Sequence, residues 1–252
     1  MVGYMLLLGT SNTRQYSPSG QRKGRLYHSN SHKCCLVPEK GTTKVADYPG
    51  LSTSSWLWQK CRSKEFVGLK PWEVISNCCL DTSFSGIVAT IFLCNDLELM
   101  TSHQGDIAAV KKYFEKLSIL FAKVLEVKKI KKVILTTSLF RQSDFLDPVN
   151  LEFKQKFNNS FLNSMNTEGC QIKVGDWVVQ HTILDLNSVF NTSQMFENKF
   201  YCKQELPPPS WKENGAVHLN RFYSQKILDK FHEIKKKLDK YSRRKHRGGR
   251  KP

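Results

Sequence analysis

The chain has 252 residues, of which 40% are hydrophobic and 11% aromatic, and it carries a formal net charge of +17. This length and apolar content are enough for one α/β domain with a full core. No run approaches the roughly 18 apolar residues of a membrane-spanning helix, so we expect a soluble protein without a membrane partner.

Three apolar runs predict buried strands in chain order: residues 4–8, 86–93 and 133–139. The first run lacks the basic start and small-residue cleavage site of a secretory signal, so it is better interpreted as a strand. Continuous apolar runs of this length are typical of strands that are covered on both faces. They favour a central parallel sheet.

Three stretches have apolar residues at spacings of three and four, which predicts helices over 106–127, 153–165 and 219–238. Helices that alternate with buried strands imply crossover connections and a three-layer α/β/α sandwich around a central parallel sheet. A further strand is expected at 171–179 or at 181–186, and periodicity does not separate the two. One α/β domain is expected over residues 1–240.

Two segments have no such periodicity. Residues 17–44 are rich in Ser, Gly, Lys, Arg and His and predict a long surface excursion. Residues 226–252 contain twelve Lys/Arg against three acids, and we expect 241–252 to be a disordered basic tail. Such a tail fits contact with nucleic-acid phosphates or an import receptor, or it is a solvated solubility tail. The residues for nucleic-acid contact are Arg243, Arg244, Lys245, Arg247, Arg250 and Lys251.

The eight cysteines include no C-x-x-C spacing. Without a secretory signal, reduced thiols and an intracellular location, cytoplasmic or nuclear, are expected. We predict no metal site from these cysteines or from the histidines near residues 28–35.

Polar residues follow the first two strands. Ser11 comes after the strand at 4–8, and Asn95 comes after the strand at 86–93. Ligands of open α/β sheets bind at the carboxyl ends of strands, where a serine could act as nucleophile and an asparagine amide could donate to an oxyanion. His218, just before the last helix, could be the base. The simpler alternative is a helix-capping Ser11 and a His218 satisfied by a backbone carbonyl.

Four short motifs resemble those of the SGNH (GDSL-like) hydrolases. Residues 9–12, Gly-Thr-Ser-Asn, resemble the family's Gly-Asp-Ser block. Asn95-Asp96 resembles its Gly-x-Asn-Asp block, residues 215–219 resemble its Asp-Gly-Val-His-Leu block, and Gly50 takes the place of its oxyanion glycine. The resemblance implies a flavodoxin-like sandwich that hydrolyses small carboxylic esters without metal or organic cofactor. It assigns Ser11 and His218 as catalytic residues, and Ser11, Gly50 and Asn95 as the oxyanion hole.

The sequence departs from the family at three positions. Thr10 and Gly215 stand where the family has aspartates, and Leu93 stands where it has a glycine. Gly215 removes the carboxylate that would orient the imidazole, a loss that elsewhere costs about 10⁴ in rate. A Ser-His dyad or a degraded triad is therefore expected, in which Glu213, Asn214 or a backbone carbonyl orients His218.

Three interpretations of the protein are compatible with these observations. The first is an SGNH-type serine esterase or acetyl-hydrolase. The second is a catalytically inactive SGNH-like module that binds nucleic acid through its basic tail, as SGNH-like domains of retroelement-associated proteins suggest. The third is an unrelated doubly wound protein in which Ser11 and His218 lie far apart.

Overall fold

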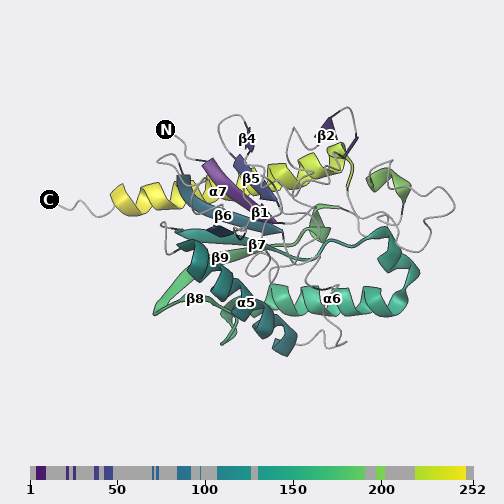
Figure 1. Cartoon of the computed structure of the whole chain (residues 1–252), viewed down its shortest axis with the longest axis horizontal. Coiled ribbons are helices and arrows are strands. Elements are labelled where there is room, and N and C mark those ends of the chain that lie inside the picture. The colour runs from purple at the N-terminus through teal and green to yellow at the C-terminus, as the bar shows by residue number, and fades with distance from the viewer. Residues whose placement is uncertain are drawn as a thin grey trace.

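The structure is a computed structural model of the whole chain (Figure 1). It describes residues 4–9, 21–22, 25–26, 37–39, 43–47, 70, 72–73, 84–91, 97, 107–125, 130–190, 197–201 and 219–247. These residues form one seven-stranded sheet with helices on both of its faces, together with a two-stranded ribbon of β2 (Gln21–Arg22) and β3 (Arg25–Leu26).

The strand order of the large sheet is β4-β5-β1-β6-β7-β9-β8. Its strands are β1 (Tyr4–Gly9), β4 (Val37–Glu39), β5 (Thr43–Asp47), β6 (Phe84–Ile91), β7 (Lys132–Thr136), β8 (Ile172–Val174) and β9 (Trp177–Leu184). The five inner strands pair in parallel, whereas β4 and β8 are antiparallel edges. Counted along the chain, the parallel strands have the order 2-1-3-4-5, which is that of flavodoxin-like folds. The prediction of a central parallel sheet is confirmed.

Both faces of β1 are buried, which explains its continuous apolar sequence. Leu6 and Leu8 belong to one core cluster, and Met5 and Leu7 belong to the other, because successive side chains of a strand point to opposite faces. All four side chains are fully buried. The sheet is therefore the middle layer of three.

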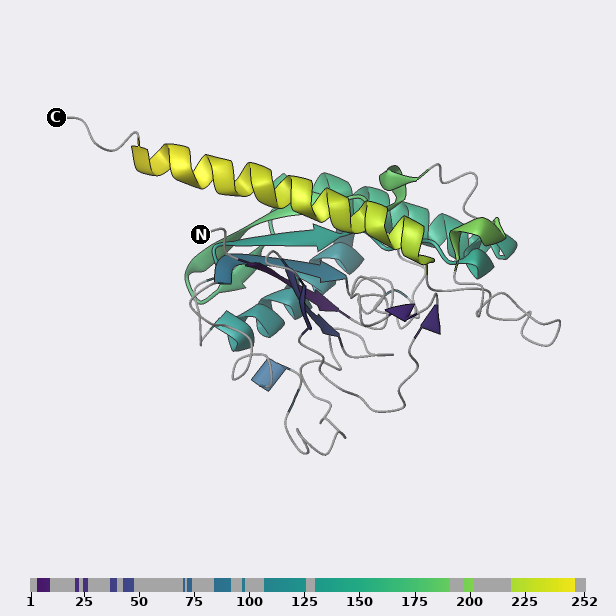
Figure 2. The ribbon, with the colours of Figure 1, turned by 90° about the horizontal axis from the view of Figure 1, so that it is seen from above.

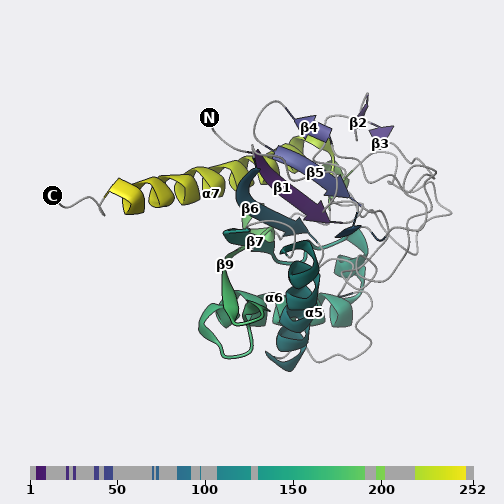
Figure 3. The ribbon, with the colours of Figure 1, turned by 60° about the vertical axis from the view of Figure 1, so that its left-hand side comes forward.

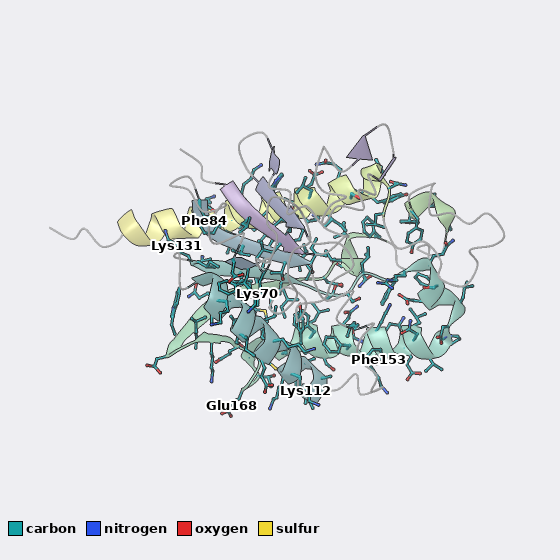
Figure 4. The ribbon with its side chains drawn as sticks, viewed as in Figure 1. Lys70, Phe84, Lys112, Lys131, Phe153 and Glu168 are labelled. Atoms are coloured by element: carbon teal, nitrogen blue, oxygen red, sulfur yellow. The ribbon has the colours of Figure 1, made fainter. Side chains whose placement is uncertain are left out.

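One outer layer consists of α5 (Ile107–Leu125) and α6 (Pro148–Leu162). Its buried aromatic side chains are Tyr113, Phe114, Phe121, Phe153, Phe157 and Phe161. Tyr113 packs edge-on against Phe157 and Phe161, with centroids 6.5 and 5.6 Å apart. Figure 4 labels Phe153 on α6. The apolar spacing that predicted these helices is thus the face that packs on the sheet.

The other outer layer is α7 (Arg221–Arg247). Its buried residues Ile227, Leu228 and Phe231 pack with Met5 and Leu7 of β1. The helix runs antiparallel to the strands and starts beyond their carboxyl ends (Figures 2 and 3). The predicted three-layer α/β/α sandwich is confirmed.

Residues 17–44, where a long surface excursion was predicted, contain β2, β3, β4 and the first residues of β5, and β4 and β5 join the large sheet. The β5 sequence, Thr-Lys-Val-Ala-Asp, has too few apolar residues to be recognised as a buried strand. A further strand was predicted at 171–179 or at 181–186, and the structure has a strand in each range. β8 lies within 171–179, and β9 overlaps both ranges. Gly175, with φ of 59°, lies in the turn that joins them.

The last helix also differs from the prediction. It continues to Arg247, so residues 241–247 are helical where a disordered tail was expected. Lysine and arginine are good helix formers, and the segment continues an existing helix without paying a new nucleation cost. Residues 248–252 lie outside the described residues.

Candidate active site

The parallel strands end level at one edge of the sheet. Gly9, the last residue of β1, is in register with Asp47 of β5 on one side and with Ile91 of β6 on the other. On the other half of the sheet, Thr136 of β7 is in register with Leu184 of β9. The loops that leave these strands therefore start from a common edge, which is where open α/β sheets bind ligands.

The predicted catalytic residues Ser11 and His218 and the predicted oxyanion-hole residues Gly50 and Asn95 lie outside the described residues, so the structure gives no distances between them. In sequence, Ser11 follows Gly9 by two residues, Gly50 follows Asp47 by three, and Asn95 follows Ile91 by four. His218 directly precedes Leu219. The structure does bring three strand ends together. The segments that contain Ser11, Gly50 and Asn95 follow these strand ends in sequence.

The residue after His218 is held firmly. Leu219 is buried and forms an antiparallel bridge with Tyr201. Asn220 donates its backbone N–H to the carbonyl of Phe200 at 2.9 Å, and its side-chain oxygen accepts from the N–H of Tyr223 at 3.2 Å. Asn220 thus caps the start of α7 and fixes the chain directly after His218.

A buried polar network, which we did not predict, closes the ends of β7 and β9. The Thr137 hydroxyl donates to Asp185 Oδ1 at 2.9 Å and accepts from the N–H of Leu186 at 2.9 Å. Asn187 donates to the carbonyl of Ser138 at 2.8 Å and accepts from the N–H of Phe140 at 3.3 Å. The polar residues that directly follow each of these strands in sequence are the pattern from which this network could have been predicted. The network fixes the geometry of this edge.

An ion pair lies under the same edge. Lys154 Nζ of α6 is 2.7 Å from Asp144 Oδ1 in the turn η2 (Gln142–Leu146), and both side chains are 1% exposed. Tyr201 donates to the carbonyl of Phe140 at 3.5 Å. Burial raises the pKa of Tyr201, and the negative charge of Asp144 adds to the rise, so this phenol stays protonated. These contacts connect α6 to the segment that carries Leu219.

His181 of β9 is partly buried, with its ring 5.2 Å from that of Phe114. Burial lowers its pKa, so the imidazole is neutral near pH 7. It faces the layer of α5 and α6, opposite to α7. His181 is therefore part of the packing of the sheet.

For the predicted nucleic-acid residues, the structure describes the helical backbone of Arg243, Arg244, Lys245 and Arg247. Their side chains, and the whole of Arg250 and Lys251, lie outside the described residues. In the described part of the chain, no three His, Cys, Asp or Glu side chains are arranged to hold a metal ion. None of the helices described there has both the length and the apolar character needed to cross a bilayer.

The sequence matches no protein-family model, and it matches no curated protein. The fold is similar to that of a member of the lipolytic G-D-S-L family from Veillonella parvula, with a TM-score of 0.49 and 13% identity over 92% of this chain and 97% of that chain. It is also similar to an acetyl esterase solved with an acetate ion (TM-score 0.45, 14% identity, 94% and 100% covered). A third similar structure is a variant of an acetyl xylan esterase from Geobacillus stearothermophilus (TM-score 0.43, 13% identity, 89% and 90% covered).

These three likenesses are likenesses of fold and do not show an activity for this chain.

Proposed function

We propose that the chain is a divergent SGNH (GDSL-like) hydrolase that cleaves a small carboxylic ester with Ser11 and His218. The observation that carries this proposal is the level edge formed by Gly9, Asp47 and Ile91. The motif residues Ser11, Gly50 and Asn95 follow these three strand ends within four residues. Since consecutive Cα atoms are about 3.8 Å apart, connections of this length allow all three residues to reach the same edge.

The chemistry assigned to these residues is acyl transfer. His218 takes the proton of the Ser11 hydroxyl as Oγ attacks the ester carbonyl, and then delivers that proton to the leaving alcohol. The amides of Ser11 and Gly50 and the side-chain amide of Asn95 donate to the oxyanion. A water molecule, deprotonated by His218, attacks the acyl-enzyme, and the proton returns to Ser11 as the acid is released.

The first prediction concerns the nucleophile. Hydrolysis of p-nitrophenyl acetate by the full chain should fall to background in Ser11→Ala and in His218→Ala, because each removes one half of the dyad. Ser188→Ala is the matched control, since Ser188 is exposed on the same edge after β9 and its hydroxyl donates to the Asp185 carbonyl. Equal rates for Ser11→Ala and the unmodified chain would contradict the proposal.

The second prediction concerns the missing acid. Gly215→Asp restores the carboxylate three residues before His218, and it should raise kcat by at least tenfold because that carboxylate orients and stabilises the imidazolium. The gain should disappear when Ser11→Ala is added. A gain that survives Ser11→Ala would show that the rate does not pass through Ser11.

A second candidate function is nucleic-acid binding through the basic C-terminal residues, with or without catalysis. The observation that favours it is the continuation of α7 to Arg247, which carries Arg243, Arg244, Lys245 and Arg247 on a helix. Arg250 and Lys251 extend the same charge. Phosphate contacts of this kind release counterions and make binding strongly salt-dependent.

The third prediction tests that candidate. Replacing the six tail residues Arg243, Arg244, Lys245, Arg247, Arg250 and Lys251 by Gln in the full chain should weaken binding of a fluorescent 20-nucleotide oligomer and flatten its salt dependence. The measurement is fluorescence anisotropy over a salt series. An unchanged affinity and salt slope would remove the tail from the binding surface.

A further inference from the structure

One face of α7 is buried and the opposite face is cationic. Ile227, Phe231 and Leu228 pack on the sheet. On the other side, five exposed residues follow each other at helical spacings of three, four or seven: Phe222, Lys226, Lys230, Lys237 and Lys240. Residues at such spacings lie on one side of a helix. We call these five residues the outer face of α7.

The four lysines of the outer face form a predominantly positive track. From Lys226 to Lys240 the track is about 21 Å long at 1.5 Å per residue. Glu233 lies on the same side and pairs with Lys230, with 2.9 Å between Nζ and Oε2. After Glu233 the helix has eight Lys/Arg and one acid, Asp239. The positive charge of α7 thus increases toward its carboxyl end.

The geometry leaves this track accessible. In Figures 1, 2 and 3, α7 lies along one side of the sheet and its last turns extend beyond the amino ends of the strands. Among the described side chains of α7, packing on the core continues to Leu238. The helix therefore packs on the sheet up to Leu238, and its last turns extend beyond the sheet.

An aromatic residue stands at the start of the track. Phe222 is 63% exposed. It packs edge-on against Tyr223, whose ring stacks on that of Phe200 with centroids 4.3 Å apart. Lys226 Nζ lies 4.8 Å from the Phe222 centroid and 5.4 Å from that of Tyr223. Phe222 is thus an exposed ring with a rigid support and a cation beside it.

We propose that the outer face of α7 binds single-stranded nucleic acid, with the lysines against successive phosphates and Phe222 stacked on a base. Sequence-tolerant binding of single strands combines these two elements, a positive track for the backbone and an exposed aromatic ring for the bases. The proposal deepens the nucleic-acid candidate above and does not depend on ester hydrolysis. It also differs from the tail hypothesis, because the residues it names precede position 241.

The experiment compares two triple variants of the full chain that have the same net charge. The test variant is Lys230→Gln/Lys237→Gln/Lys240→Gln, on the outer face. The control is Lys112→Gln/Lys156→Gln/Lys173→Gln, which removes three exposed lysines from α5, α6 and β8. Figure 4 shows Lys112 on α5, across the sheet from α7. The ligand is a fluorescent 20-nucleotide oligo(dT) or oligo(U), measured by anisotropy over a salt series.

The test variant should bind at least tenfold more weakly and lose about two units of the slope of log K against log salt, since each phosphate contact with a single strand contributes about 0.7. The control should change affinity less than twofold. Phe222→Ala should weaken binding about tenfold at an unchanged slope, and Phe222→Tyr should restore it, because stacking is not ionic. A 20-base-pair duplex should bind more weakly than the single strand and be insensitive to Phe222→Ala.

Several results would overturn the proposal. Equal losses in the two triple variants would show a general charge effect and no localised face. A Phe222→Ala variant that binds normally would remove the stacking contact. Binding of phosphatidylserine vesicles, but of no oligomer, through the same lysines would assign the face to a lipid surface. If only the six tail substitutions reduce binding, the tail hypothesis stands and the outer-face proposal is wrong.

Discussion

At the residue scale, Asn158 of α6 connects the helix layer to the carboxyl edge of the sheet. Its side chain accepts from the N–H of Ser138 and donates to the carbonyl of Ser138, each at 2.9 Å. Ser138 follows β7 and is fully buried, so its backbone groups have no access to water. One amide side chain therefore bonds both backbone polar groups of a buried residue beside the candidate site.

The fourth prediction follows from this contact. Asn158→Ala should lower the free energy of unfolding by about 2–4 kcal/mol, because it leaves a buried donor without its partner and weakens the satisfaction of a buried acceptor. Asn159→Ala is the matched control, since the neighbouring Asn159 is exposed, and it should change stability by less than about 0.5 kcal/mol. Urea denaturation followed by circular dichroism measures both. Similar losses in the two variants would mean that the Ser138 contacts contribute little.

At the scale of elements, α6 carries two lysines in different environments. Lys154 pairs with Asp144 where both side chains are 1% exposed, and Asp144 also accepts from the Asn150 side chain at 2.8 Å. Lys156 pairs with Glu152 at 3.6 Å where both are about 70% exposed. The first pair fixes η2 against α6, whereas the second lies in solvent.

The fifth prediction compares these two pairs. Lys154→Met should destabilise the fold by about 3–5 kcal/mol because it leaves the Asp144 charge buried without its cation. Lys156→Met should cost at most about 0.5 kcal/mol, as is usual for exposed pairs on a helix. The denaturation midpoints of the two variants check this. If Asp144→Asn added to Lys154→Met restored no stability, the uncompensated charge would not be the cause.

At the scale of the whole molecule, the two cores on either face of the sheet share the same strands. β1 contributes Leu6 and Leu8 to one core and Met5 and Leu7 to the other. Neither helix layer can separate without exposing one face of a strand that is otherwise fully buried. We therefore expect the seven-stranded sheet and its two helix layers to unfold as one cooperative unit, in which α7 covers the first strand.

The sequence alone determined the elements with strong periodicity. The strands at 4–9 and 84–91 and the helix at 107–125 agree with the apolar patterns to within two residues, because their burial demands continuous or helically spaced apolar side chains. The motif residues Ser11, Gly50, Asn95 and His218 were also found from sequence, since the family resemblance rests on short local patterns. Their relative positions stay a prediction.

Other features were decided only by tertiary structure. β5 is a strand because it pairs with β1, although its own sequence has little apolar character. Asp144 and Lys154 are ten residues apart and look like ordinary surface charges, but the packing of η2 on α6 buries both. Propensity and pattern describe what a segment does by itself, whereas strand order, the level carboxyl edge and the burial of charge depend on partners that are distant in sequence.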